Sequence, residues 1–336
     1  MTSIDDVARA AGVSIATVSR ALRGLPNVSD ATRSRVKTVA DELGYVASAG
    51  ASGLASGRTL TMGVVVPSVS RWFYQMALEG IDEELRRANY DMMLFNLAAR
   101  KGDRERVFHR SILRKRTDAL IALCLEFTPS EREQLLSLGH PTIVIGGPVK
   151  GIRHIGIDER ATARAATQHL ITLGHRRIAH VGGDDDEGLN RRVPLDRRRG
   201  FRDAMEAAGL AVRPEWLLSG RFSLAPSRAV VNEMLASAER PTAIVANSDE
   251  MAIGAIMAAH DSGLQVPGDL SVIGIDNHDL AESFGLTTMA QDPFEQGALG
   301  ARILLDDLGG IVPPRRTSVT APSHLIVRTS TAPPIH

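Results

Sequence analysis

Cysteine is almost absent from this chain of 336 residues, since Cys124 is the only one. A single thiol cannot build a disulfide framework or a cysteine metal site within one chain, which is typical of a protein of the reducing cytoplasm. Cys124 lies in the apolar run Ala119–Leu125, where we expect it to be a small buried hydrophobe. The sequence also lacks eighteen consecutive apolar residues and a basic start followed by an apolar stretch, so we expect neither a membrane span nor secretion.

Net charge is absent as well, because 39 basic residues balance 39 acidic ones. A small imbalance remains inside residues 1–58, which hold seven basic and five acidic side chains. That sign is the expected one for a phosphate-bearing partner, although the excess is slight. A chain of this length with 43% hydrophobic residues can bury a large core and is expected to contain more than one domain.

The motifs that would indicate catalysis are missing. No Gly-x-Gly-x-x-Gly follows a predicted strand. The glycine-containing segment Gly146–Gly151 continues with Ile152-Arg153, where a phosphate-binding loop needs Lys and then Ser or Thr. No His-Glu-x-x-His pair marks a zinc helix, and the ten histidines are scattered. We therefore expect no enzyme activity, no cofactor and no metal site.

The first 46 residues are predicted to form three short helices around one apolar centre. Ser3 and Asp6 form a capping box at the start of the first helix, and Gly12 supplies the backbone freedom of a tight turn. Ser14 and Ser29 are the expected N-caps of the second and third helices. Apolar side chains recur at helical spacing in the third helix, at Val36, Val39, Ala40 and Leu43.

The segment Val13–Leu22 is the most informative of these helices. With the preceding helix and the turn at Gly12 it forms a helix-turn-helix pattern, which is typical of proteins that read DNA. The alternative is an ordinary surface helical hairpin, because the bare pattern also occurs without DNA binding.

Beyond residue 46 the composition changes twice. Residues 47–59 are mostly Ala, Ser and Gly, which have little to pack and are typical of a linker. After the linker, short apolar runs alternate with longer amphipathic ones. In the first half the expected strands are Met62–Pro67, Met92–Phe95, Ala119–Leu125 and Thr142–Ile145. In the second half they are Ile178–Val181, a strand near Trp216-Leu217, Ala243–Ala246 and Ser271–Ile275.

Amphipathic segments between these runs predict helices. They are Phe73–Ala88, Glu105–Lys115, Ser130–Ser137, Arg160–Leu173, Asp196–Ala208, Pro226–Ser237 and Asp249–Ser262. Continuous apolar strands bounded by helices predict parallel sheets covered on both faces. Because the pattern occurs twice, we expect two α/β lobes with a ligand cleft between them, at the carboxyl ends of the strands.

Several short motifs occur in a specific order along the chain. They are Asp6-Val7-Ala8, Ala11-Gly12-Val13-Ser14, Thr17-Val18-Ser19-Arg20, Gly44-Tyr45, Leu173–Ala179, Arg197 with Gly200-Phe201, Ser248-Asp249 with Met251-Ala252 and Gly254, and Gly274-Ile275-Asp276. In this combination the chain resembles the LacI/GalR family of transcriptional regulators over nearly its whole length.

The resemblance implies a helix-turn-helix headpiece joined to a core that is similar to periplasmic sugar-binding proteins. We expect an all-α headpiece at 1–46, a hinge linker at 47–59 and an α/β core of two parallel-sheet lobes at 60–336. The N-lobe is expected at about 60–159 and 290–320, and the C-lobe at about 160–289 and 321–330.

The resemblance also implies that the second helix enters the major groove of DNA. Ile15, Ala16 and Arg20 correspond to base-reading positions. Arg20 can donate two hydrogen bonds to guanine O6 and N7, whereas Ile15 and Ala16 offer apolar contacts or merely pack against the backbone. Hydroxyl groups suited to phosphate contacts are those of Ser14, Thr17, Ser19, Ser29 and Thr32.

In the linker, Leu54 corresponds to the leucine that the family's hinge helix inserts into the minor groove, with Ala51 three residues earlier. The linker departs from the family pattern, because Ala47-Ser48 stands where Pro-Asn is common. Gly50 and Gly53 each disfavour a helix by about 1 kcal/mol relative to Ala. We therefore expect a hinge that is disordered away from DNA and folds only weakly on it.

Effector-binding positions follow from the same resemblance. Phe73 and Tyr74, in the aromatic run Trp72-Phe73-Tyr74, fall where a ring can stack on an effector, although such rings also pack on the lobe. Arg197 corresponds to an arginine that holds hydroxyls or carboxylates, and Asp276 to an acid that accepts from hydroxyls. Further expected contacts are Arg191, Phe222, Asn247, Ser248 and Asp249. The set is compatible with a sugar, a nucleoside or another small polar molecule.

Together these expectations describe a homodimeric repressor of a pseudo-palindromic DNA operator, switched by a small polar effector, a sugar first of all, in the cleft. The alternative is a cytoplasmic sugar-binding protein without operator function, which the core alone would support. The headpiece and the lack of a signal peptide favour the regulator. Residues 329–336 contain no leucine heptads, so no tetramer built by the tail is expected.

Overall fold

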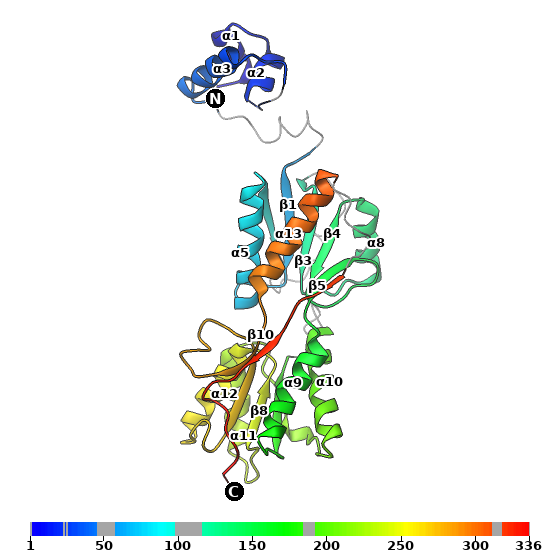
Figure 1. Ribbon diagram of the computed structural model, residues 1–336, viewed down its shortest axis with the longest axis vertical. Coiled ribbons are helices and arrows are strands. Elements are labelled where there is room, and N and C mark those ends of the chain that lie inside the picture. Colours follow the sequence, from blue (N-terminus) through cyan, green and yellow to red (C-terminus); the bar gives the residue numbers. More distant parts are fainter. Residues whose placement is uncertain are drawn as a thin grey trace.

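A computed structural model describes residues 2–22, 24, 26–45, 58–97, 116–183, 192–310 and 318–335. It contains three packed helices at the N-terminus and a core of two α/β lobes, each built on a six-stranded sheet (Figure 1). The predicted fold class, an all-α headpiece joined to two parallel-sheet lobes, is confirmed.

The headpiece consists of α1 (Ile4–Ala11), α2 (Ile15–Leu22) and α3 (Asp30–Glu42). The predicted capping box is present, because Ser3 Oγ accepts from the N–H of Asp6 while the Asp6 carboxylate accepts from the N–H of Ser3. Gly12 ends α1 at φ 66°, a left-handed conformation that favours glycine. One cluster of buried side chains joins the helices: Val7, Ala8, Ala11, Val18, Ala21, Val36 and Ala40. The headpiece therefore has a core of its own.

The N-lobe is built on a parallel sheet with strand order β11-β5-β4-β3-β1-β2. Its strands are β1 (Thr61–Val66), β2 (Asp91–Asn96), β3 (Ala119–Leu123), β4 (Thr142–Ile145), β5 (Arg153–Gly156) and β11 (Ser318–Thr320). Helices α5 (Trp72–Arg87) and α13 (Pro293–Gly309) cover one face, and α8 (Pro129–Leu138) covers the other. Cys124 is buried beside this core, as predicted, and burial raises the pKa of its thiol to about 12.

The C-lobe sheet has strand order β12-β10-β9-β8-β6-β7, and only β12 runs antiparallel to its neighbour. Its strands are β6 (Ile178–Gly182), β7 (Leu217–Ser219), β8 (Ala243–Ala246), β9 (Ser271–Asp276), β10 (Thr287–Ala290) and β12 (His324–Ile326). One face is covered by α9 (Glu159–Thr172) and α10 (Arg192–Ala207), the other by α11 (Leu224–Leu235) and α12 (Asp249–Asp261).

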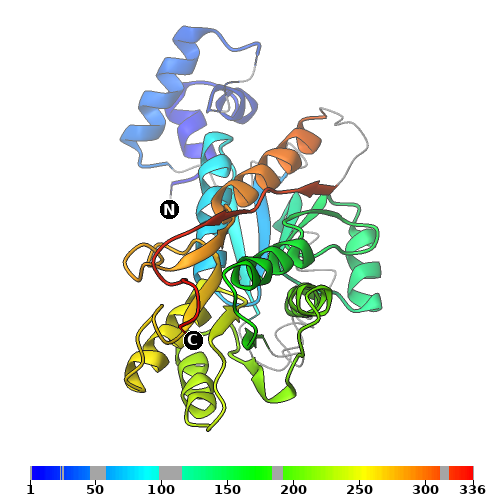
Figure 2. The ribbon, with the colours of Figure 1, turned by 60° about the horizontal axis from the view of Figure 1, so that its bottom comes forward.

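The described chain crosses between the lobes three times, after β5, after β10 and after β11. The last crossing is the red segment that runs from the N-lobe edge to the C-lobe in Figures 1 and 2. As a result, α13 and β11, which come late in the sequence, complete the N-lobe. No helix in the described part of the chain is long and apolar enough to cross a membrane.

Several elements differ from the sequence expectations. Strands β5, β10, β11 and β12 were not expected, because none of them contains three consecutive apolar residues. Helix α13 was also missed, although Asp292 caps it and Pro293 opens it, which are both signals of a helix start. The strand expected at Trp216-Leu217 begins at Leu217, because Trp216 belongs to a preceding 3₁₀ turn. The expected helix Glu105–Lys115 lies outside the described residues.

Helices α5 and α13 cross at a pair of glycines. A methyl group on Gly80 would lie 2.0 Å from the carbonyl oxygen of Phe294, and one on Gly297 would lie 2.1 Å from that of Ala77. Both obstacles are backbone atoms, which cannot move without shifting a helix. By contrast, a methyl group on Gly300 would meet only the end of the Ile145 side chain, at 3.1 Å. The close approach of the two helices therefore depends on Gly80 and Gly297.

We expect Gly297→Ala to lower the free energy of unfolding by about 1–3 kcal/mol, because the added methyl forces the two helices apart. Gly300→Ala on the same helix is the matched control. It adds the same methyl against a side chain that can rotate, and gains up to about 1 kcal/mol in helix propensity. Urea titrations of both variants measure the difference. Equal losses of unfolding free energy in the two variants would contradict the conclusion that the helix crossing depends on Gly297.

Candidate functional site

The DNA-reading residues predicted in the headpiece lie on α2 and at the start of α3. Ile15, Ala16 and Arg20 are exposed, and 45% of Ile15 is accessible, which is unusual for a large apolar side chain. Arg20 forms no hydrogen bond or ion pair with the described residues, so its guanidinium is available to a ligand. The opposite side of α2 carries the buried Val18 and Ala21. One face of α2 thus packs in the headpiece and the other faces outward.

The predicted hydroxyl residues have local partners. Ser14 Oγ accepts from the N–H of Thr17 at 3.1 Å, and Ser29 Oγ accepts from the N–H of Thr32 at 3.3 Å. Each serine also shares a hydrogen bond with the hydroxyl of the same threonine. These pairs cap the N-termini of α2 and α3, where partial positive charge favours a phosphate. Ser19 is half-buried on α2.

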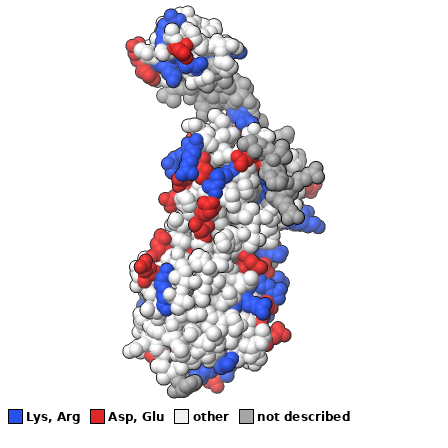
Figure 3. All heavy atoms as spheres, in the orientation of Figure 1, with Lys and Arg blue, Asp and Glu red and all other residues white. Residues whose placement is uncertain are grey.

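Charge on the headpiece is mixed. On the face seen in Figure 3, Lys and Arg lie beside Asp and Glu, without a surface of one sign. This agrees with the small basic excess counted in the sequence. The hinge residues Ala51 and Leu54 lie outside the described residues.

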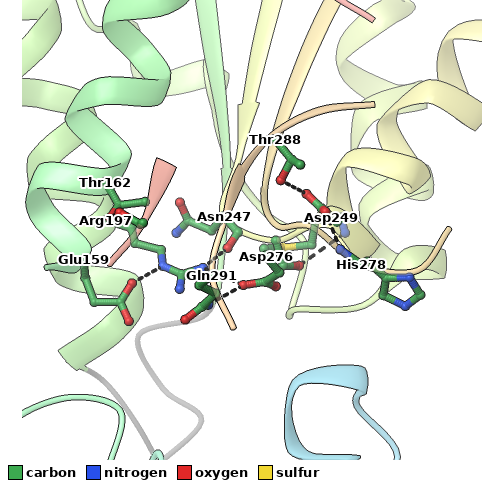
Figure 4. Close-up of polar contacts among 12 residues, drawn as sticks. Glu159, Thr162, Arg197, Asn247, Asp249, Asp276, His278, Thr288 and Gln291 are labelled. Atoms are coloured by element: carbon green, nitrogen blue, oxygen red, sulfur yellow. Dashed lines mark hydrogen bonds and ion pairs between the residues drawn. The ribbon is translucent and has the colours of Figure 1, made fainter. Parts of the chain in front are cut away.

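A buried polar cluster lies at the carboxyl ends of the C-lobe strands β8 and β9 (Figure 4). Its centre is Arg197 on α10, which is 4% exposed. The guanidinium donates from Nε to Glu159 Oε2 at 2.6 Å and from Nη1 to the carbonyl oxygen of Asn247. Its Nη1 also lies 4.0 Å from Oδ1 of Asp276. The structure therefore brings together three of the predicted residues, Arg197, Asn247 and Asp276, around one buried charge.

Asp276 is aimed into this cluster by an unusual backbone. Its φ is 125° and that of Asn277 is 62°, both positive values that non-glycine residues rarely adopt. The side chain of Gln291 donates to Asp276 Oδ1 at 2.6 Å, and Gln296 donates to Gln291 at 3.0 Å. Burial raises the pKa of Asp276 to about 8, against the opposing charge of Arg197. Strain and desolvation at one carboxyl group are typical of a functional site.

The side chains of residues 247–249 differ in whether all their hydrogen-bonding atoms have partners. Asp249 accepts from Thr288 Oγ1 at 2.7 Å and from the N–H of His278 at 2.8 Å, and burial raises its pKa to about 6. Ser248 caps α12 through a bond from the N–H of Met251. These two residues support the C-lobe with their own bonds.

Asn247 is different, because it is fully buried and its Nδ2 has no partner among the described residues. Its Oδ1 pairs with Nε2 of His180 at 2.9 Å. Burial lowers the pKa of His180 to about 4, so the imidazole is neutral at pH 7. Since the amide oxygen of Asn247 can only accept, Nε2 is the nitrogen that donates. The amide is thereby oriented with its unused donor directed away from His180.

The N-lobe reaches this region through the start of α5. Arg71 donates to the carbonyl oxygen of Arg221 at 3.1 Å, and its guanidinium carbon lies 5.5 Å from the centre of the Phe222 ring. The Trp72 ring lies 5.0 Å from that of His278. Two consecutive residues of the N-lobe thus contact two separate loops of the C-lobe.

Three predicted aromatic residues have different surroundings. Phe222, at φ 47°, lies against Gly183, where an added methyl would come within 2.1 Å of the ring. Phe73 and Tyr74 instead pack against the N-lobe core, in an edge-to-face pair with centroids 5.7 Å apart. Trp72, which was not on the list of expected contacts, is the ring of this run that faces the other lobe.

A hollow of about 270 Å³ lies at the carboxyl ends of β3 and β4, on the N-lobe side of the boundary. Its lining includes Phe127, Gly147 and Pro148, together with Arg192 from the C-lobe helix α10. Arg191, the next residue of the predicted set, lies outside the described residues. Among the described residues, His, Cys, Asp and Glu side chains form no group of three or more that could hold a metal ion.

Sequence reasoning missed Glu159 and Gln291. Glu159 follows Asp158, whose side chain caps α9, so an acid at this position is equally well explained by the helix start. Gln291 lies between a strand that was not expected and a helix that was not expected. Only the fold brings both residues to Arg197 and Asp276.

The raised pKa of Asp276 makes stability depend on pH in a definite direction. An aspartic acid in the unfolded chain titrates near pH 3.9, so between about pH 4 and about pH 8 the folded chain retains a proton that the unfolded chain releases. This group therefore destabilises the fold as the pH rises through that window. We expect Asp276→Asn to reduce the loss of unfolding free energy between about pH 5 and about pH 8.5, measured by urea titration.

Asp203→Asn is the control for this experiment. Asp203 is another C-lobe acid, but its hydrogen bonds with Arg160 lower its pKa, so its titration lies below the window. We expect its profile to run parallel to that of the wild type. A parallel profile for Asp276→Asn would show that Asp276 does not titrate as described.

Both parts of the chain match known protein families. Residues 3–48 match the bacterial regulatory proteins of the lacI family, and residues 167–331 match a periplasmic binding protein-like domain. Catabolite control protein A of Priestia megaterium is 35% identical over 306 residues, which cover 90% of this chain and 91% of that protein.

Two solved structures cover nearly the whole chain. The lac repressor dimer bound to operator and the anti-inducer ONPF has a TM-score of 0.85 at 25% identity, over 98% of this chain and 99% of that one. The complex of the transcriptional regulator CelR with cellobiose has a TM-score of 0.71 at 29% identity, over 98% of this chain and 100% of that one. These relatives are transcriptional regulators, and the identity to catabolite control protein A extends over both headpiece and core. The chain therefore belongs to the LacI family of DNA-binding transcriptional regulators.

Proposed function

We propose that this regulator is a homodimeric repressor whose affinity for a pseudo-palindromic operator is switched by a small, sugar-like effector bound between its lobes. The observation that carries the effector part is Arg197, a buried cation at the carboxyl ends of β8 and β9. A guanidinium beside a carboxylate suits the paired hydroxyl groups of a sugar. The cellobiose complex of CelR supports a ligand of this class.

Within the cleft, Arg197, Asp276 and Asn247 are the proposed polar contacts, and Phe222 the proposed ring. Ser248 and Asp249 hold the loops that carry them. Phe73 and Tyr74 support the proposed position of Trp72 at the boundary. Arg191 is retained as a contact on resemblance alone.

On DNA, α2 is the proposed reading helix. Arg20 is the proposed donor to a base edge, while Ile15 and Ala16 supply apolar contacts. The proposed phosphate contacts are Ser14, Thr17, Ser19, Ser29 and Thr32. Leu54, with Ala51, is the proposed minor-groove contact of the hinge at 47–59. The operator-bound lac repressor dimer supports two headpieces on one site.

The proposed switch acts through the contacts between the lobes. An effector that prefers one arrangement of Trp72 against His278 and of Arg71 against Phe222 changes how the two lobes meet. If that arrangement also sets the spacing of the headpieces, effector binding changes the protein's affinity for the operator. Operator binding then changes the protein's affinity for the effector by the same factor. We propose that this coupling operates in the cytoplasm, where the operator is.

A sugar-binding protein without operator function is the alternative. The outward face of α2, where Ile15 and Arg20 are exposed, favours the regulator. A full chain that bound a sugar but discriminated no operator from random DNA would favour the alternative.

We expect Arg20→Ala to weaken operator binding by about 1–3 kcal/mol for each half-site, because each headpiece of the homodimer loses one base-edge contact. Binding to random DNA should change much less, since it depends on phosphate contacts. Arg9→Ala removes the same charge from α1, outside the reading helix, and is the matched control. Fluorescence anisotropy with operator and scrambled duplexes at fixed salt measures both affinities. If the two variants lost specific and random binding in equal proportion, α2 would not be the reading helix.

A thermal-shift screen of sugars, nucleosides and small acids on the full chain identifies the effector class, because a bound ligand raises stability in proportion to occupancy. We expect hits among sugar-like compounds, and we expect Asp276→Asn to abolish the shift. Ser262→Ala, at the end of α12 and away from the cluster, is the control. A hit that left operator affinity unchanged would contradict the proposed switch.

A further inference from the structure

We propose that Glu159 makes the cleft selective for uncharged, hydroxyl-bearing effectors, because it neutralises Arg197 and so excludes carboxylates and phosphates. This rests on the proposed function, in which the effector binds at Arg197. It adds a specificity-determining residue that lies beside the effector contacts and that the sequence did not indicate.

The first step is geometric. Glu159 Oε2 accepts from Arg197 Nε at 2.6 Å, and the two side chains are only 11% and 5% exposed. Nη1 of the same guanidinium is bonded to the carbonyl oxygen of Asn247. An anionic ligand would have to compete with an internal carboxylate that is already in place and already desolvated.

The second step is the balance of charge. Arg197 lies between two carboxyl groups, since Asp276 is on its other side at 4.0 Å. Burial raises the pKa of Asp276 to about 8, so at neutral pH this group keeps its proton and Glu159 is the acid that pairs with the guanidinium. The charges of Arg197 and Glu159 cancel within this buried ion pair. A ligand anion would therefore meet no free positive charge here, and the cost of its own desolvation would not be offset.

The third step concerns what the cluster can still bind. Asp276, 4.0 Å from Arg197, accepts from Gln291 through Oδ1. A hydroxyl group both donates and accepts, so it can pair with this carboxyl group whether the carboxyl group is protonated or ionised. A carboxylate or phosphate can pair with it only while it keeps its proton.

The test measures anion binding directly, with inorganic phosphate as the probe. Thermal unfolding of the full chain is followed in phosphate and in chloride at matched ionic strength, for the wild type and for Glu159→Gln. Glutamine keeps an acceptor for Arg197 Nε but removes the charge. We expect the variant to gain a saturable stabilisation by phosphate, with an apparent dissociation constant at least about tenfold lower than that of the wild type.

Asp203→Asn is the control, because it removes one acidic charge from the C-lobe at an ion pair with Arg160, outside the cluster. It should respond to phosphate as the wild type does. Any phosphate site in the headpiece is common to all three proteins and cancels in the comparison. If Glu159→Gln does not fold, Glu159→Ala replaces it.

An equal response of wild type and Glu159 variant overturns the proposal, whether both bind phosphate or neither does. So does a gain of the same size in Asp203→Asn. The experiment uses neither DNA nor an effector, so its failure leaves operator binding and the effector screen unaffected. Conversely, failure of the operator assay would not alter the phosphate comparison.

Discussion

The arrangement of the C-lobe around its candidate site depends on one buried cation. Arg197 ties the start of α9, through Glu159, to the end of β8, through the carbonyl of Asn247. An unpaired charge in this position would cost several kcal/mol, so each of these partners has to remain in place. The guanidinium thus fixes the relative positions of two helices and a strand end. Charge pairing thus acts together with the apolar packing of α9 and α10 to set the geometry at this edge of the sheet.

The polar bonding extends from this cation across the edge of the sheet. Gly274 leaves the space that the Asp249 carboxylate fills, because an added methyl would lie 2.0 Å from Asp249 Oδ1. Asp249 in turn holds Thr288 of β10 and the backbone of His278. The C-lobe side of the boundary is therefore a network with many internal bonds. Arg71 and Trp72 of the N-lobe contact this side of the boundary at Arg221 and His278.

Some parts of the fold can be predicted from local signals in the sequence. Ser3 with Asp6, Ser14 and Ser29 predict the headpiece correctly, because capping is local and leaves a signal within four residues. Strands such as β1, β3 and β8 are predicted by apolar runs that only burial on both faces explains.

Nonlocal features leave no such signal. Short edge strands such as β11 are stabilised by their neighbour in the sheet and carry no apolar pattern of their own. Glu159 meets Arg197 from 38 positions away, and nothing in either neighbourhood marks the pair. For the same reason the sequence cannot distinguish Trp72, which faces the other lobe, from Phe73 and Tyr74, which pack inside their own.

The late position of α13 and β11 has a consequence for synthesis of the chain. The headpiece cluster draws only on residues 4–45, so it can form as soon as that part leaves the ribosome. The N-lobe sheet begins at β1, yet the apolar face of α5 is covered by α13, and the edge strand β5 is paired by β11. Neither element exists until the C-lobe has been translated as far as β10. The headpiece of each new chain is thus complete well before either lobe of the core.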